Sequence, residues 1–271
     1  MFEVLTAAWA APGVKRFRVA APRVAEHWRA GQFVIVRAGE GAERIPLTIA
    51  EGDATEGWIG LIVQSVGAST TEINSLEVGD TFSDVVGPLG TPSEVEAVGS
   101  VVVVGGGVGV AIAYPTAVAH VAAGNDVTAI IGGRTADHVI LEQELAAACS
   151  RVVVCTDDGS AGRPGFVTDA LSDRLEEGEV DLVVAIGPIA MMRAVTGVTR
   201  SRQIPTIVSL NPIMVDGTGM CGGCRVLVGG ETKFACVDGP EFDAHAVDFD
   251  VLDARNRSYR DFERRACAVA E

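Results

Sequence analysis

Between Ser100 and Leu210, apolar runs of strand length alternate with longer helical stretches. The runs are Val101–Val104, Val127–Ile131, Val152–Val154, Asp181–Ile186 and Thr206–Val208. This alternation is typical of a doubly wound parallel sheet with helices on both faces. Such sheets bind ligands at the carboxyl ends of their strands, so the turns that follow these runs are the candidate sites.

The turn after the first run is rich in glycine and leads into a predicted helix. It contains Gly105, Gly106, Gly107 and Gly109. Bare backbone amides at a helix N-terminus favour a pyrophosphate. However, Val110 occupies the third glycine position of G-x-G-x-x-G, and no acidic residue ends the second strand. The turn therefore predicts either a nucleotide site or tight packing alone.

Two further strand ends carry candidate residues. The second strand leads into Arg134 and Thr135, a cation and a hydroxyl, and the fourth ends at Gly187 and Pro188. Arg134 could pair with a 2′-phosphate, because guanidinium–phosphate pairing is strong. Only one cation lies there, and Asp137 adds a carboxylate that would repel a phosphate.

The first hundred residues predict a small antiparallel β-barrel, because short alternating strands are separated by glycine and proline. One strand has the sequence Arg44-Ile45-Pro46-Leu47-Thr48. Ser69 and Glu72 have the S-x-x-E spacing of a capping box, which predicts that a helix begins there. Its free amides would accept a phosphate, and Arg44 could clamp the same group. An ordinary exposed arginine is the alternative for Arg44.

Three cysteines and an aspartate near the C-terminus have the spacing D-x4-C-x2-C-x11-C. They are Asp216, Cys221, Cys224 and Cys236. The pattern has the shape of a plant-type [2Fe–2S] site in which a carboxylate replaces the first thiolate. The stretch between the last two cysteines predicts a hairpin centred on Gly230, which sets Cys224 opposite Cys236. Structural zinc, which also accepts sulfur and oxygen ligands, is the alternative.

Length and charge limit the remaining possibilities. The chain has 271 residues and a formal net charge of −15, and no basic stripe, which excludes a nucleic-acid partner. The uncharged stretch 97–119 contains a strand, a turn and a helix start, so we expect no membrane span. No signal peptide is apparent, so we expect a cytoplasmic protein with reduced thiols. We expect three parts: a barrel (1–98), a nucleotide-binding sheet (99–210) and a cluster lobe (211–271).

Together these segments resemble the ferredoxin-NADP reductase superfamily over nearly the whole chain. Within it, the order of parts is similar to the electron-transfer subunits of dihydroorotate dehydrogenase B. It is closest to the small (alpha) subunits of NADH-dependent ferredoxin:NADP oxidoreductases. E-R-I-P-L-T-I at Glu43–Ile49 and the aspartate at position 216 carry the resemblance to the ferredoxin:NADP oxidoreductase subunits.

The resemblance implies an oxidoreductase subunit with three cofactors or substrates. FAD would lie against Arg44, Pro46, Leu47, Thr48, Gly67, Ser69 and Thr70, with Thr48 beside the reacting flavin nitrogen. NAD(H) or NADP(H), of which we expect NAD(H), would bind the sheet, with its nicotinamide near Gly187 and Pro188. The [2Fe–2S] cluster would occupy the cysteine segment.

The resemblance also implies a larger iron–sulfur flavoprotein as the second subunit of a heterodimer. The other hypotheses are the electron-transfer subunit of an NAD-dependent dihydroorotate dehydrogenase and a nucleotide-binding regulatory module with structural zinc.

Overall fold

The computed structural model describes residues 2–258, which form two compact units. The chain passes from one unit to the other several times. The first unit comprises Met1–Pro92, Asn211–Pro240 and Asp248–Glu271. The second comprises Ser93–Leu210 and Glu241–Val247. The predicted three-part division stays a prediction, and residues 259–271 of its last part lie outside the described residues.

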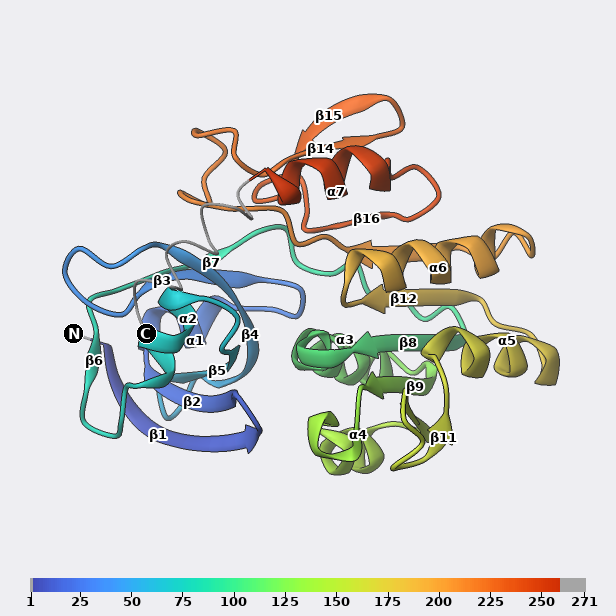
Figure 1. Cartoon of the computed structure of the whole chain (residues 1–271), viewed down its shortest axis with the longest axis horizontal. Coiled ribbons are helices and arrows are strands. Elements are labelled where there is room, and N and C mark those ends of the chain that lie inside the picture. Colours follow the sequence, from blue (N-terminus) through green and yellow to red (C-terminus); the bar gives the residue numbers. More distant parts are fainter. Residues whose placement is uncertain (1, 259–271) are drawn as a thin grey trace. The chain divides into compact units, whose positions relative to one another are not determined.

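The first unit contains an antiparallel, nearly closed barrel, shown in blue and cyan in Figure 1. Its strands, in spatial order, are β6 (Thr81–Phe82), β1 (Phe2–Ala11), β2 (Val14–Ala20), β5 (Trp58–Gln64), β4 (Ile45–Asp53), β3 (Phe33–Arg37) and β7 (Asp84–Leu89). The alternating pattern turns one face of each strand inward, where Phe17 and Phe82 pack edge to face. The barrel prediction is confirmed. Helix α1 (Pro22–His27), which no motif indicated, also packs on it.

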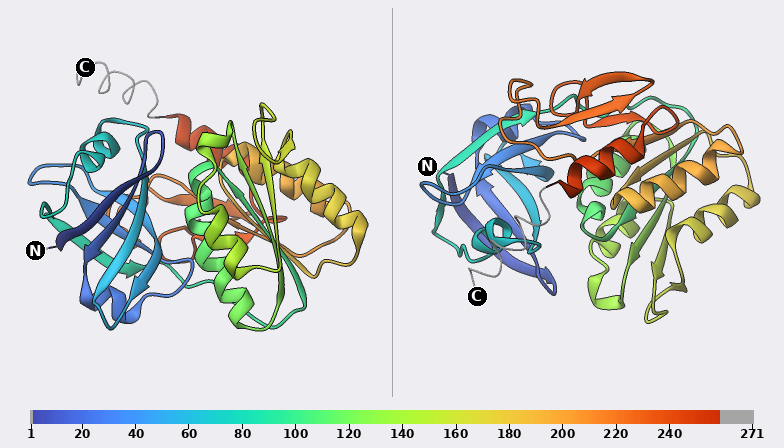
Figure 2. Two further views of the ribbon diagram at one scale, coloured as in Figure 1. Left: turned by 90° about the horizontal axis from the view of Figure 1, so that it is seen from below. Right: turned by 45° about the horizontal axis from the view of Figure 1, so that its top comes forward.

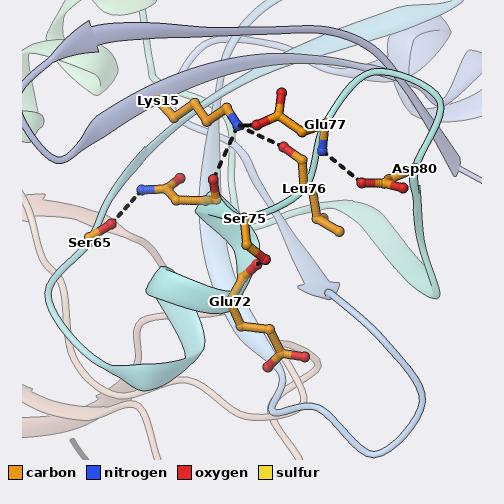
Figure 3. A network of polar contacts seen from close by, with 8 residues as sticks. Lys15, Ser65, Glu72, Ser75, Leu76, Glu77 and Asp80 are labelled. Atoms are coloured by element: carbon orange, nitrogen blue, oxygen red, sulfur yellow. Dashed lines mark hydrogen bonds and ion pairs between the residues drawn. The ribbon is translucent and has the colours of Figure 1, made fainter. Parts of the chain in front are cut away.

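A buried lysine fixes the end of the other barrel helix, α2 (Ala68–Asn74). Lys15 is 1% exposed, and its Nζ donates to the carbonyls of Asn74 (3.1 Å) and Leu76 (2.8 Å). It also contacts the carboxylate of Glu77 at 2.8 Å, as Figure 3 shows. These carbonyls lack partners within the helix, so the ammonium satisfies them. Its positive charge also interacts favourably with the negative, C-terminal end of the helix dipole. Lys15 therefore holds α2 in place from its C-terminal end.

The second unit is built around a seven-stranded sheet. Its spatial order is β11 (Arg163–Pro164), β10 (Arg151–Thr156), β9 (Asp126–Gly133), β8 (Ser100–Gly106), β12 (Leu182–Ile186), β13 (Thr206–Ser209) and β16 (Glu241–Asp243). All neighbours are parallel except β13 and β16. The five predicted runs form β8, β9, β10, β12 and β13, which confirms the parallel sheet. The antiparallel strand β16 was not predicted, since it comes from the segment assigned to the cluster lobe.

Helices cover both faces of this sheet. One face carries α3 (Val110–Ala122) and α4 (Glu142–Ala148), and the other carries α5 (Val167–Glu177) and α6 (Ile189–Arg200), as the left view of Figure 2 shows. The central strands are near-continuous apolar runs because they are buried on both faces. Short 3-10 turns lie at Gly107–Gly109 and Ala136–His138.

The remaining elements belong to the first unit. They are the hairpin β14 (Arg225–Val228) and β15 (Glu231–Phe234), and helix α7 (Phe249–Arg257), which packs on β14 (Figure 1).

Candidate functional site

The first half of the predicted flavin strand has one edge without a paired strand among residues 2–258. The first half of β4 pairs with β3, where Phe33 lies opposite Thr48 and Ile35 opposite Pro46. On its other side, pairing with β5 begins only at Ile49. Pro46 is tolerated there because it need not donate to a second strand. Pro46, Leu47 and Thr48 are half-buried. A ligand at this edge would therefore meet the strand backbone, the Thr48 hydroxyl and the apolar side chains of Pro46 and Leu47.

The structure brings the predicted phosphate-binding residues of the barrel together. The Ser69 hydroxyl donates a hydrogen bond to the carboxylate of Glu43, the residue before exposed Arg44. The capping-box prediction was wrong: the N-cap is Gly67, and the Thr70 hydroxyl accepts the Gly67 N–H at 3.1 Å. Ser69 lies within the first helical turn, where backbone N–H groups have no partner inside the helix.

In the second unit, the glycine turn lies against the end of β12. A Cβ on Gly109 would be 2.5 Å from the Ile186 carbonyl oxygen, and one on Gly106 would be 2.4 Å from the Met191 sulfur. A Cβ on Gly187 would be 3.1 Å from the Gly106 backbone. Close packing thus explains these glycines without a ligand.

The turn also has a polar face. Helix α3 begins at Val110 with no side-chain cap, and the Val110 N–H donates to the Gly107 carbonyl of the preceding 3-10 turn. The amides of that turn, Gly107–Gly109, come before the first helical hydrogen bond and are the candidates for binding an anion. Strands β8 and β12 are neighbours at the point where the strand order reverses, which is the usual ligand crevice of such sheets. The structure therefore brings Gly105–Gly109 together with Gly187 and Pro188.

The loop after β9 contains an exposed arginine and an engaged hydroxyl. Arg134 is exposed, whereas the Thr135 hydroxyl contacts His138 Nδ1 at 2.8 Å. The loop after β10 joins it, because Asp158 N–H donates to the Arg134 carbonyl at 3.3 Å. Sequence reasoning missed this second loop, whose Thr156-Asp157-Asp158 run after the third strand was the available signal.

The loop after β10 is negatively charged. Hydrogen bonds from the Ser160 hydroxyl and backbone lower the pKa of Asp158, which keeps its carboxylate ionised at neutral pH. Asp157 N–H donates to the Gly133 carbonyl at 3.1 Å, so both aspartates follow the end of β10 beside the loop that carries Arg134.

The hairpin of the cysteine segment has a different register from the predicted one. Arg225 pairs with Phe234 and Val228 with Glu231, so the loop contains only Gly229 and Gly230. Both glycines have positive φ, 60° and 82°, as a two-residue turn requires when its twist matches the strands. The backbone partner of Cys224 is consequently Ala235, whose N–H donates to the Cys224 carbonyl at 3.1 Å.

The thiols of Cys224 and Cys236 nevertheless meet, as the sequence predicted. Cys224 and Cys236 are 1% exposed and their sulfurs are 3.2 Å apart, because the turn after Phe234 carries Cys236 back toward Cys224. Asp216 accepts the backbone N–H of Cys221 at 2.7 Å and that of Thr218 at 2.9 Å. No three metal-binding side chains between Phe2 and Ser258 gather in one group. The four predicted ligands thus form two pairs.

The electrostatics of the two pairs differ. Backbone hydrogen bonds, first from Thr218, lower the pKa of Asp216, so its carboxylate is ionised. An ionised carboxylate has about four lone-pair sites, so two backbone bonds leave room for a metal. Burial and the neighbouring Cys224 thiol raise the pKa of Cys236 to about 12. A bound metal reverses this preference, since a coordinating thiol is deprotonated.

The donor set fits an iron–sulfur cluster on chemical grounds. Three sulfurs and one carboxylate lie in a loop with glycines at positive φ: Gly217, Gly219 and Gly222. A Cβ on Gly217 would be 2.6 Å from Leu89, and one on Gly219 would be 3.2 Å from Val237. The glycines let the loop fold tightly on its own unit while its amides stay near the ligands, as the Gly223 N–H does 3.4 Å from the Cys221 sulfur.

Comparison with known proteins agrees with this geometry. Residues 211–248 match the model of the iron–sulfur cluster binding domain of dihydroorotate dehydrogenase B. A homologue of the electron transfer subunit of dihydroorotate dehydrogenase B (NAD(+)) from Thermotoga maritima is 48% identical, over 97% of this chain and 93% of its own. The electron transfer subunit from Bacillus caldolyticus is 37% identical, over 83% and 88%.

Solved structures give the same result. A structure of NADH-dependent reduced ferredoxin-NADP oxidoreductase is 46% identical with a TM-score of 0.94, over 98% of this chain and 96% of that one. An Amycolatopsis cytochrome P450 reductase, 23% identical over 75% of this chain and 66% of its own with a TM-score of 0.64, shares the fold.

No helix between Phe2 and Ser258 has the length and hydropathy of a transmembrane span. The Thermotoga maritima homologue and the solved oxidoreductase align over 97% and 98% of this chain, so both sheets and the cysteine segment are shared with them. The chain belongs to the family of dihydroorotate dehydrogenase B electron-transfer subunits and their homologues, within the ferredoxin-NADP reductase fold.

Proposed function

We propose that this chain is the FAD- and [2Fe–2S]-containing subunit that moves electrons between a nicotinamide nucleotide and a larger iron–sulfur flavoprotein. The observation that carries the proposal is the segment Asp216–Cys236, where the thiols of Cys224 and Cys236 meet and Asp216 accepts the backbone N–H of Cys221. When bound, FAD and the cluster supply the conversion of a two-electron hydride into single electrons. The side chains bind, orient and tune these groups.

Each ligand pair suits one iron of a binuclear cluster. We assign Asp216 and Cys221 to one iron and Cys224 and Cys236 to the other, since each pair is joined by a direct contact or by a backbone bond. The Gly223 N–H, 3.4 Å from the Cys221 sulfur, stabilises negative charge on that thiolate.

In the barrel, the free edge of β4 would receive the flavin ring. Thr48 would donate its hydroxyl to the ring, while the first turn of α2 and Arg44 would bind the pyrophosphate. The contact between Ser69 and Glu43 supports this arrangement, because it places the start of α2 beside the segment that carries Arg44.

In the second unit, the amides of the turn Gly107–Gly109 before α3 would bind the pyrophosphate of the nicotinamide nucleotide. We assign NAD(H) rather than NADP(H) as its substrate. Asp157 and Asp158 support this choice, because their backbone bonds join this acidic loop to the loop of Arg134, and carboxylates there would repel a 2′-phosphate and could accept hydrogen bonds from a ribose hydroxyl.

Two relatives suggest different electron acceptors. The similarity to NADH-dependent reduced ferredoxin-NADP oxidoreductase, together with a carboxylate as the fourth ligand, favours a ferredoxin:NADP oxidoreductase subunit. The matched domain model favours the alternative, an electron-transfer partner of dihydroorotate dehydrogenase. In either case we expect a heterodimer in the cytoplasm.

The partner would dock close to the cluster. Val215, Met220 and Val237 are 49%, 87% and 43% exposed and lie in the cysteine segment or directly after its last ligand. Exposed apolar side chains so close together are typical of an interaction surface.

Anaerobic purification followed by iron, sulfide, zinc and flavin analysis tests the proposal. We expect two irons, two sulfides and one FAD per chain, as the formula of one [2Fe–2S] cluster and one flavin requires. Cys224→Ser should lose the cluster and keep FAD, and Cys149→Ser, a cysteine remote in sequence from the segment, is the matched control. Zinc in place of iron would overturn the assignment. Co-purification with the partner then separates the two acceptors.

A further inference from the structure

Helix α7 lies directly against the cysteine segment, although it falls outside the residues that match the cluster-binding domain model. Its N-cap Asp248 accepts the N–H groups of Asp250 and Val251, and the Asp248 N–H donates to the Leu227 carbonyl at 2.9 Å. The helix is therefore fixed to the hairpin β14–β15 at its beginning. The right view of Figure 2 shows α7 in red beneath this hairpin.

Two side chains at the other end of α7 hold the segment itself. Asn256 Nδ2 donates to the Asn211 carbonyl at 3.1 Å, on the chain that leads into the cysteine segment Asp216–Cys236. A guanidinium nitrogen of Arg255 donates to the Gly223 carbonyl at 3.0 Å, between Cys221 and Cys224. The cation thus contacts the peptide group that separates two predicted ligands.

This arginine is incompletely satisfied. Its Nε is buried and has no hydrogen-bond partner among the described residues. A guanidinium cannot lose its proton in a protein, so it stays charged at every working pH. Arg255 is half-buried, and a partly desolvated guanidinium with an unpaired buried N–H is stabilised by a negative group near it.

A [2Fe–2S] cluster with three thiolate ligands and one carboxylate is such a negative group. Its net charge is negative when oxidised and becomes more negative when one electron is added. A cation held close by in a partly desolvated site favours the reduced form over the oxidised form. Hydrogen bonding and charge around the sulfurs are known to set the potentials of such clusters.

We propose that Arg255 is a positioning residue that fixes the Gly223 peptide between the cluster ligands and raises the reduction potential of the cluster. This inference rests on the proposed function, since it requires the cluster at Asp216–Cys236. Reduction adds one electron to the cluster and breaks no bond, so the charge of Arg255 acts directly on the equilibrium.

The experiment is a redox titration of the purified holoprotein with mediator dyes, followed by visible absorption and electron paramagnetic resonance. Arg255→Gln keeps a hydrogen-bond donor without the charge, and Arg255→Lys keeps the charge with one compact donor group. The matched control is Arg257→Gln, which removes the same charge from the same helix. Arg257 has a side chain 61% exposed and forms a surface pair with Asp253.

For Arg255→Gln we expect about a tenfold fall in the equilibrium constant for cluster reduction, which is ~59 mV for one electron. Arg255→Lys should retain most of the wild-type potential, and Arg257→Gln should leave it unchanged because solvent screens that charge. Equal potentials for the wild type and Arg255→Gln would overturn the inference, as would equal shifts for Arg255→Gln and Arg257→Gln.

The outcomes also separate the inference from the proposed function. Wild-type protein without iron and sulfide would overturn both. If Arg255→Gln loses its cluster, the Arg255→Lys variant provides the test. A tenfold fall in its equilibrium constant for cluster reduction would overturn the role of the charge. A potential equal to that of the wild type would support it.

Discussion

Gly109→Ala tests whether the turn at the start of α3 requires glycine for space alone. Gly109 has φ −58° and ψ −20°, an ordinary helical conformation that alanine also adopts. A Cβ there would lie 2.5 Å from the Ile186 carbonyl oxygen and 2.8 Å from the Gly187 Cα, whereas ordinary contact begins at 3.4 Å. The neighbouring atoms are backbone, so the turn and the end of β12 must separate by about 0.9 Å, the difference between 3.4 and 2.5 Å.

Overpacking of this kind costs about 1–3 kcal/mol. At ~2 kcal/mol, the apparent Tm of a domain of 150–250 residues falls by roughly 4–8 °C. The displaced amides of the turn Gly107–Gly109 should also bind the nicotinamide nucleotide more weakly. Thermal unfolding followed by circular dichroism measures the first effect, and nucleotide titration measures the second.

Gly197→Ala is the matched control, because Gly197 lies inside α6 with no atom within 4 Å of an added Cβ. Alanine should stabilise that helix by about 0.5–1 kcal/mol. The reasoning fails if Gly109→Ala unfolds at the wild-type temperature, or if the Tm of Gly197→Ala falls as much as that of Gly109→Ala. In either case, lack of space beside the end of β12 is not the reason that position 109 is glycine.

Three further outcomes are expected. Burial lowers the pKa of His120 below its ordinary value of 6.5, so the unfolded chain takes up a proton below that pH and stability falls as the pH drops. His120→Gln should flatten the decline in unfolding temperature between pH 7 and 5; an unchanged slope would contradict this cause. Met220→Asp should weaken co-purification with the partner while iron content stays constant, and loss of iron instead would show a structural role. Arg134→Ala should reduce affinity for NADH and NADPH to a similar degree in stopped-flow flavin reduction; a selective loss with NADPH would point to a 2′-phosphate contact.

The sequence correctly predicted the elements whose structure is decided by the pattern of apolar residues alone. The runs that form β8, β9, β10, β12 and β13 are apolar throughout because both faces of the sheet are covered, so they were recognisable without tertiary information. Strand β16 was not recognisable, because three residues pair with β13 only after the chain has passed through the cysteine segment.

The hairpin turn and the helix N-cap were harder to predict. The hairpin register differed by one residue because two glycines at positive φ form a shorter turn than the predicted one. Gly67 rather than Ser69 is the N-cap of α2, and the Thr70 hydroxyl takes the place expected for the Glu72 carboxylate, because residue spacing alone does not fix where a helix begins. The pairing of Cys224 with Cys236 was still predicted correctly, as the turn after Phe234 compensates for the shift.

The pairing of β13 with β16 has a consequence for how such proteins can be rebuilt. Ser209 lies opposite Glu241, so the chain leaves the sheet and returns to it at adjacent positions. The cysteine segment is therefore an insertion between two paired strands, and its length scarcely affects the entropy of closing it, at ~0.6 kcal/mol for each doubling. Modular exchange is possible at this position: a short turn could replace residues 211–240 and leave a flavin–nucleotide module, or another electron carrier could be grafted between the same two strands.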